Sequence, residues 1–150
     1  MAIDFGQVRV GLAKCDKDML LASPVATLQN GEHLFVDLIT IIRQVEPSVI
    51  YVGNPINLQG QPTASTHLAV EFAYQLMNMC EAEQIQLQIR LVDERLTTVS
   101  AQSAVHKAGR TSKQARDFID QAAAMELLEF ALNIERAQKA YAGELVQVKN

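Results

Sequence analysis

The residues Val49-Ile50-Tyr51-Val52 form a continuous apolar run, rich in β-branched and aromatic side chains. A strand that is apolar at every successive position is typical of a parallel sheet whose two faces are both covered. The segment before it, 31–45, carries apolar residues at helical spacing and is followed by Pro47, which ends a helix. The run therefore predicts a sheet with helices packed on both of its faces.

The other patterns complete a mixed sheet. Short strands over 1–5, 8–13 and 20–28 predict an antiparallel meander, with a turn at 4–7. After the apolar run we expect a helix from Ser65 or Thr66 to about Glu83, a strand over 86–92, a short helix over 97–107, and a long helix from Thr111 or Ser112 to about Tyr141. The sequence thus predicts one α/β domain with a five-stranded mixed sheet, three strands in the meander and two parallel; the tail from Gly143 would fray or add a short strand.

The composition is that of an ordinary globular domain. The chain has 150 residues, of which 49% are hydrophobic and 20% charged. Its apolar stretches are too short to cross a bilayer, and Asp4 falls where a signal peptide would be apolar. We therefore expect a cytoplasmic protein that does not contact membranes. Cys15 and Cys80 stand too far apart in the sequence to suggest a zinc motif, and a disulfide is not expected.

Positive charge is concentrated in one segment. The net charge is −4, yet six of the thirteen Lys and Arg residues lie between Arg90 and Arg116, against the acids Asp93 and Glu94. Such a segment is what a surface that follows a phosphate backbone would need, although a solvated basic helix end would look the same.

Three acids stand where their neighbours give no reason for an acid: Asp4 and Glu94 at strand ends, and Asp120 on the core-facing side of the long helix. An inward carboxylate is costly unless it is paired or bound to a cation. If the three converge, Mg²⁺ is the natural counter-charge, and two such ions would promote phosphodiester hydrolysis. Each acid alone also has a structural explanation. Asp4 could initiate a turn, Glu94 could form a surface ion pair with Arg95, and Asp120 could be favoured by the helix macrodipole.

Further residues suit contact with a nucleic acid. Arg9 follows Asp4 within a glycine-containing turn and could hold a phosphate, and Gly11 would allow a close approach by substrate or by a neighbouring element. Asn54 lies in a polar loop at the end of the apolar strand. The basic side chains expected to contact phosphates are Arg95, Lys107, Arg110, Lys113 and Arg116.

The order of four blocks resembles the YqgF-type (RuvX-like) family of pre-16S rRNA nucleases, also described as Holliday-junction-resolvase-like proteins. The blocks are Asp4-x-Gly6-x-x-Arg9-x-Gly11-x-Ala13, Gly53-Asn54-Pro55 through Gly60, Asp93-Glu94-Arg95-Leu96-Thr97-Thr98, and Asp120 shortly before Ala123-Ala124. The third block is the most specific. The second departs from the family pattern at Asn54 and Gln59, which weakens any metal-ligand role for that loop.

This resemblance implies an RNase H-like fold with catalytic, metal-binding carboxylates at Asp4, Glu94 and Asp120. Asp93 is a rival to Glu94, because adjacent strand residues point to opposite faces and only one should reach the metal. Asp117, one turn before Asp120, is a lesser rival. The implied cofactor is Mg²⁺, with Mn²⁺ as a substitute.

The function expected on these grounds is a metal-dependent endonuclease that acts on structured RNA, in the 5′-end maturation of pre-16S ribosomal RNA, as a monomer or weak homodimer. One alternative is a resolvase of branched DNA, which would favour a symmetric dimer. Another is a non-catalytic nucleic-acid-binding regulatory module. An actin-like ATPase shares the Asp-x-Gly turn, but 150 residues are too few for its two lobes.

Overall fold

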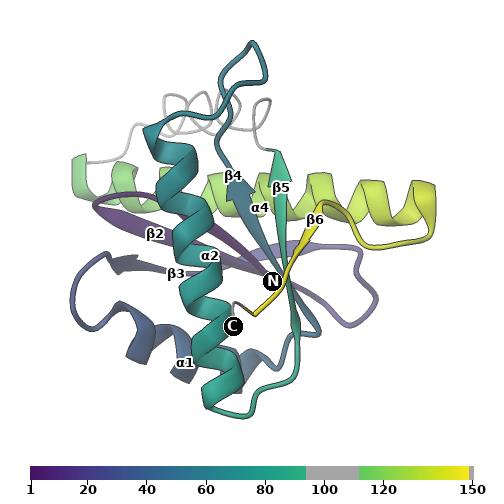
Figure 1. The fold of residues 1–150 in the computed structure, drawn as a ribbon, viewed down its shortest axis with the longest axis horizontal. Coiled ribbons are helices and arrows are strands. Elements are labelled where there is room, and N and C mark those ends of the chain that lie inside the picture. Colours follow the sequence, from purple (N-terminus) through teal and green to yellow (C-terminus); the bar gives the residue numbers. More distant parts are fainter. Residues whose placement is uncertain (94–111, 149–150) are drawn as a thin grey trace.

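The computed structural model of the chain describes residues 1–93 and 112–148, and these form a six-stranded mixed sheet with helices on both faces (Figure 1). The strands are β1 (Ala2–Phe5), β2 (Arg9–Cys15), β3 (Ala22–Gln29), β4 (Val49–Asn54), β5 (Gln88–Asp93) and β6 (Glu144–Val146). The helices are α1 (Leu34–Val45), α2 (Ala64–Ala82) and α4 (Ser112–Gln138). The expected short helix over 97–107 lies outside the described residues.

The strand order is β3-β2-β1-β4-β5-β6. β1, β2 and β3 form the predicted antiparallel meander, and β4 and β5 continue from β1 in parallel. The prediction of five strands is wrong by one, because β6 pairs antiparallel with β5. Three residues are too few to show a periodicity in the sequence, so β6 could be anticipated only as an option for the tail.

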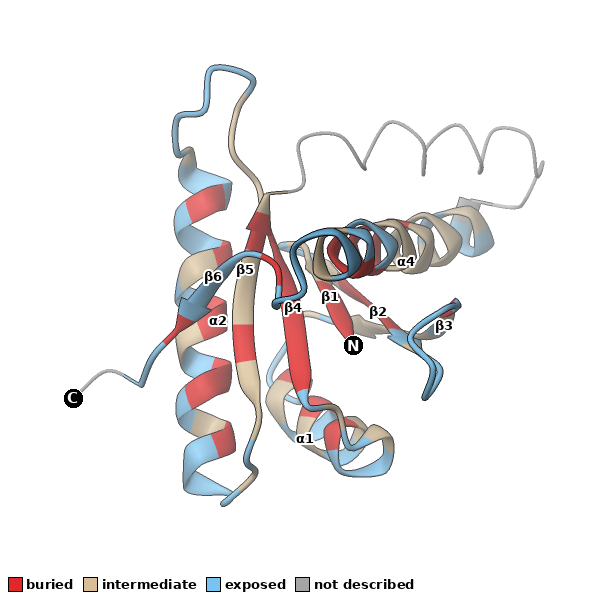
Figure 2. Cartoon of the chain, turned by 90° about the vertical axis from the view of Figure 1, so that its right-hand side faces the viewer, coloured by how far each residue is buried: buried red, intermediate tan, exposed pale blue. Residues whose placement is uncertain are grey.

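The sheet separates two apolar cores. α1 and α2 cover one face of the sheet and α4 covers the other, as can be seen in the turned view of Figure 2. Along β4 the side chains alternate, so that Ile50 and Val52 belong to the core under α1 and α2, whereas Val49 and Tyr51 belong to the core under α4. The apolar run is therefore buried on both faces, as its composition predicts.

The start of α2 differs from the expected one. The helix is capped by Thr63 and not by Ser65 or Thr66. The Thr63 hydroxyl accepts a hydrogen bond from the backbone N–H of Thr66, and the Thr66 hydroxyl accepts one from the backbone N–H of Thr63. This reciprocal pair of hydrogen bonds satisfies two backbone N–H groups at the helix start. Thr66 therefore belongs to the capping box as the third residue of the helix, and Thr63 is the cap.

Two expectations from composition can be compared with the structure. Cys15 and Cys80 are both free, as predicted. Among the helices of the described ranges, none is long and apolar enough to cross a membrane.

The backbone of α4 packs directly against the backbone of β2 at Gly11, with no room for a side chain between them. A Cβ atom built on Gly11 would stand 2.1 Å from the backbone oxygen of Asp120 and 2.4 Å from its carbonyl carbon. Two hydrogen bonds secure the same stretch of helix to β3, since the Thr27 hydroxyl donates to the carbonyl of Asp117 at 3.1 Å and Gln121 Nε2 donates to the Thr27 hydroxyl at 3.1 Å. The position and the rotation of α4 about its axis are thus fixed by its contacts with β2 and β3.

Replacing Gly11 with alanine should destabilise the fold, because the added methyl group meets helix backbone, which cannot turn aside as a side chain could. We expect the free energy of unfolding to fall by about 1–3 kcal/mol, measured by urea denaturation. Gly31→Ala is the matched control, since a Cβ there meets nothing within 4 Å. Equal stability of the Gly11 and Gly31 variants would contradict the close packing of α4.

Candidate active site

Asp4 faces α4. Ile3 and Phe5 pack into the core under α1 and α2, whereas Ala2 belongs to the core under α4, so alternation along β1 directs Asp4 to the α4 side. Asp4 is the register partner of Gly11 on the neighbouring strand. The Cα atoms of antiparallel partners are about 5 Å apart. Since Gly11 is also where α4 meets the sheet, the two predicted carboxylate positions Asp4 and Asp120 flank one glycine.

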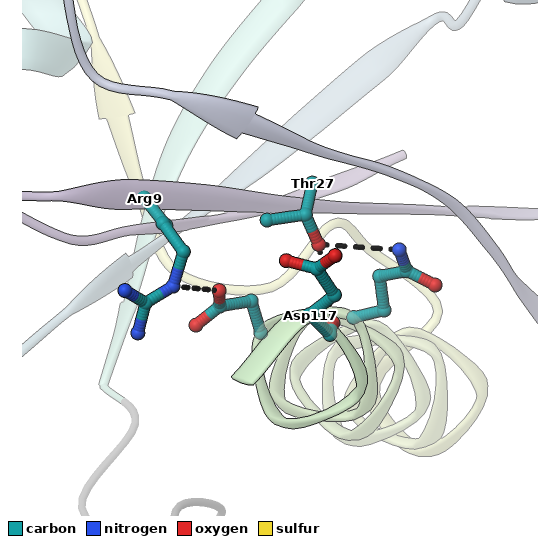
Figure 3. A network of polar contacts seen from close by, with 5 residues as sticks. Arg9, Thr27 and Asp117 are labelled. Carbon is teal, nitrogen blue, oxygen red and sulfur yellow. Dashed lines mark hydrogen bonds and ion pairs between the residues drawn. The ribbon is translucent and has the colours of Figure 1, made fainter. Parts of the chain in front are cut away.

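The carboxylate of Asp120 is half-buried and paired with Arg9. Arg9 Nε donates to Asp120 Oδ2 at 2.8 Å, with 27% of the Arg9 side chain and 14% of the Asp120 side chain exposed (Figure 3). Burial raises the pKa of Asp120; the hydrogen bond and charge of Arg9 oppose this rise, while the charge of Asp117 adds to it. Arg9, predicted as a phosphate contact, is thus the partner of a candidate metal ligand in this structure.

Thr27 and Gln121 were not anticipated from the sequence. In Figure 3, Arg9 and Thr27 project from neighbouring strands toward the same helix. Thr27 is the register partner of Gly11, so Asp4, Gly11 and Thr27 lie in one row across β1, β2 and β3. The available signal was a polar side chain within a strand, which is common and does not indicate which helix it contacts.

Asp93 stands on the other face of the sheet. Ile89 and Leu91 of β5 pack into or against the core under α1 and α2, and alternation places Asp93 with them, whereas Val92 belongs to the core under α4. Asp93 is therefore on the face opposite Asp4 and Asp120, which argues against a shared ligand role. Glu94 lies outside the described residues.

Asn54 is the register partner of Asp93 and ends β4. Its Oδ1 atom is buried and accepts no hydrogen bond from the part of the chain that is described. The sequence-based role for Asn54 was a contact with nucleic acid, and its position at the carboxyl end of a parallel strand is where ligands of such sheets bind.

The predicted basic side chains are only partly described. Lys113 and Arg116 are exposed in the first turns of α4, on the helix that also carries Asp120. Arg95, Lys107 and Arg110 lie outside the described residues. Arg90, at the start of the basic segment, instead donates to the carbonyls of Ala142 and Gly143 before β6.

The carboxylate oxygens of Asp4 and Asp120 are of the type that binds a hard divalent cation. Within residues 1–93 and 112–148, no group of three His, Cys, Asp or Glu side chains is arranged to hold a metal ion. The two predicted carboxylates that are described, Asp4 and Asp120, do share one face of the sheet, and carboxylate oxygens are the ligands that Mg²⁺ prefers. These residues therefore fit such an ion, and a third carboxylate would complete the predicted set.

Known proteins resemble this chain in sequence and in fold. The model of the RuvX family, described as Holliday junction resolvase, matches residues 1–134. Among solved structures, Thermus thermophilus RuvC in complex with Holliday junction substrate has a TM-score of 0.57 at 11% sequence identity, over 96% of each chain. This likeness concerns the fold and confirms the predicted RNase H-like architecture.

Similar sequences cover nearly the whole chain. A protein of Clavibacter sepedonicus named "Putative pre-16S rRNA nuclease" is 39% identical over 149 residues, which span 97% of this chain and 89% of the relative. A protein of the same name from Streptomyces avermitilis is 35% identical over 150 residues, with 99% and 94% covered. With Asp4 and Asp120 on one face of an RNase H-like sheet and a family match that extends over residues 1–134, the chain belongs to the RuvX family.

Proposed function

We propose that this chain is a metal-dependent endonuclease that hydrolyses phosphodiester bonds in structured RNA, and that it acts in the cytoplasm on the 5′ end of pre-16S ribosomal RNA. The observation that carries the proposal is the pair of carboxylates, Asp4 and Asp120, that flank Gly11 on one face of the sheet. The name shared by the relatives from Clavibacter and Streptomyces supports the choice of substrate.

In this proposal Asp4, Glu94 and Asp120 hold Mg²⁺, for which Mn²⁺ can substitute. A bound divalent ion would supply a nucleophilic hydroxide at neutral pH and would stabilise charge on the phosphate oxygens. The carboxylates contribute negative charge in a half-buried place, where the ionised form of Asp120 is disfavoured by burial. A cation at this place therefore relieves a cost that the fold itself imposes.

In this proposal Arg9 contacts both a metal-binding carboxylate and the substrate. Its Nε holds the Asp120 carboxylate in place. Its other four N–H groups make no hydrogen bond to the described residues and remain available for a phosphate oxygen of the substrate. The exposed cations Lys113 and Arg116 lie on the same helix, and with Arg95, Lys107, Arg110 and Asn54 they would bind the nucleic-acid backbone.

The first test replaces Asp4 with asparagine, which keeps the size of the side chain and removes its charge. We expect Mg²⁺- or Mn²⁺-dependent cleavage of a pre-16S rRNA fragment to fall at least about a hundredfold, since loss of even an outer-shell group of a metal site costs up to that much. Asp120→Asn should behave in the same way, and chelation of the metal should abolish cleavage by the unmodified protein.

Asp37→Asn is the control, because Asp37 is an exposed acid on α1, on the other face of the sheet. Calorimetric titration with Mn²⁺ adds a measurement that does not depend on turnover. Full cleavage by the Asp4 variant, with unchanged Mn²⁺ affinity, would remove Asp4 from the site.

The second test replaces Arg9 with glutamine. Without the arginine, the pKa of Asp120 should rise further, because both effects of Arg9 lower it. At neutral pH we expect a loss of about 1.5–3 kcal/mol in the free energy of unfolding, as for a hydrogen bond to a charged group. The loss should shrink as the pH falls through the raised pKa of Asp120, because the carboxyl takes up a proton first in the variant and then in the unmodified protein, and the neutral carboxyl gains little from Arg9.

Urea denaturation at several pH values measures this difference, and Arg43→Gln, which removes an exposed ion pair with Glu83, is the control. A stability difference for the Arg9 variant that does not change with pH would show that Arg9 does not act on the charge of Asp120.

A second candidate function is the resolution of branched DNA, which the description of the matching family favours. A panel of pre-16S rRNA fragments and four-way DNA junctions, each with Mn²⁺, separates the two. Preferential cleavage of junctions, together with a dimer in sedimentation analysis, would favour the resolvase. Metal-independent binding with no cleavage of any substrate would instead indicate a regulatory module.

A further inference from the structure

A cavity lies far from the candidate active site. It has a volume of about 620 Å³, is open to solvent, and is lined by the C-terminal part of α4, by β5, and by the loop between β2 and β3. We call it the α4–β5 pocket and define it by Arg90, Leu132, Glu135, Arg136, Lys139 and Tyr141. Arg136 follows Asp120 by 16 positions on the same helix, which is about 24 Å along its axis. The two sites are thus separate.

Three cations line this pocket, and neutral groups hold both guanidinium groups in place. Arg90 donates from Nε to the carbonyl of Ala142 at 2.6 Å, from Nη2 to the carbonyl of Gly143 at 2.9 Å and from Nη1 to Gln88 Oε1 at 3.0 Å. Arg136 donates to the carbonyl of Met19 at 2.6 Å and to Asn133 Oδ1 at 2.7 Å. Such acceptors fix the guanidinium groups without cancelling their charge.

The acids of the pocket do not neutralise these cations by direct contact. Glu135 accepts a hydrogen bond from the hydroxyl of Tyr51. Burial raises the pKa of Tyr51, so this hydroxyl keeps its proton at neutral pH. The other acid is Asp18, and neither it nor Glu135 forms an ion pair with Arg90, Arg136 or Lys139 among the described residues. Three cations against two acids leave a positive pocket on a chain of net charge −4.

The remaining wall is apolar and includes an aromatic ring. Leu132 is buried, with 3% of its surface exposed, while Tyr141 has 40% exposed. An accessible aromatic side chain beside fixed cations is suited to a ligand that has both a flat ring and an anionic group. The volume falls within the roughly 300–1,000 Å³ of pockets that bind small molecules.

We propose that the α4–β5 pocket binds a nucleoside phosphate. The phosphate lies against Arg136, Lys139 and Arg90, where the guanidinium groups are already oriented, and the base stacks on Tyr141. The nucleoside phosphate has two possible sources, a free nucleotide or the phosphorylated end of an RNA chain. Both present the same chemistry to the pocket.

The test is calorimetric titration with adenosine 5′-monophosphate, in the presence of EDTA so that the candidate metal site does not contribute. We expect one saturable site. The double variant Arg136→Gln, Lys139→Gln should bind at least about tenfold more weakly, since two charge-assisted contacts are lost. Tyr141→Ala should weaken binding by about tenfold through the loss of stacking. Asp4→Asn, which impairs the proposed nuclease, should bind as the unmodified protein does.

Arg43→Gln is the matched charge control, because Arg43 is an exposed cation outside the pocket and outside the proposed nucleic-acid surface. Since Arg136 also holds the carbonyl of Met19, Lys139→Gln alone is a milder variant that leaves this contact in place. Urea denaturation identifies any variant that weakens binding merely because it is unfolded. If the double variant is unfolded, the affinity of the Lys139→Gln variant tests the proposal instead.

Absence of saturable binding of the monophosphate would overturn the proposal, and so would equal affinity in the double variant or in a folded Lys139 variant. Equal affinity for inorganic phosphate, with no effect of Tyr141→Ala, would overturn the nucleoside part. An RNA oligonucleotide with a 5′-phosphate that binds more tightly than the monophosphate and than its 5′-hydroxyl form would support a chain end as the ligand. Equal affinity for the monophosphate and the 5′-phosphorylated RNA would support a free nucleotide.

Discussion

The backbone of α4 touches β2 at Gly11, and the placement of the candidate active site depends on this contact. It brings the helix residue Asp120 over the strand position that is paired with Asp4. Hydrogen bonds from Thr27 and Gln121 prevent the helix from rotating about its axis there. A larger side chain at position 11 would lift the helix and separate the two carboxylates, even though residue 11 itself carries no chemical group.

The same contact sets the electrostatics. Pressing α4 onto the sheet buries the Asp120 carboxylate, and this burial opposes ionisation. Arg9 counteracts it from β2, two residues before Gly11 on the same strand. Burial and the negative charge of Asp117 both disfavour the ionised form of Asp120, so a cation bound beside this carboxylate would be stabilising. A partly exposed arginine is a suitable counter-charge, because its guanidinium group can interact with the carboxylate and with a further anion at once.

Much of the architecture could be predicted from the sequence. The run Val49–Val52 predicted a sheet covered on both faces because each residue is apolar, and the structure confirms it. Asp4 and Asp120 could be singled out because an acid among core-facing positions needs a reason. The sequence could not reveal β6, which is too short to show a pattern, or the link from Thr27 to α4, which joins residues 90 positions apart. The sequence also could not show that Arg9 pairs with Asp120, because an arginine that binds a carboxylate and one that binds a phosphate have the same sequence pattern.

The short strand β6 has a consequence for how copies of this chain behave in solution. β5 would otherwise be the edge of the sheet, with a row of unsatisfied N–H and C=O groups. β6 covers Ile89, Arg90 and Leu91 by antiparallel pairing, and Arg90 fastens the turn that precedes it. Three residues thus block the middle of β5 from pairing with a strand of another molecule, which protects this edge of the sheet against edge-to-edge aggregation.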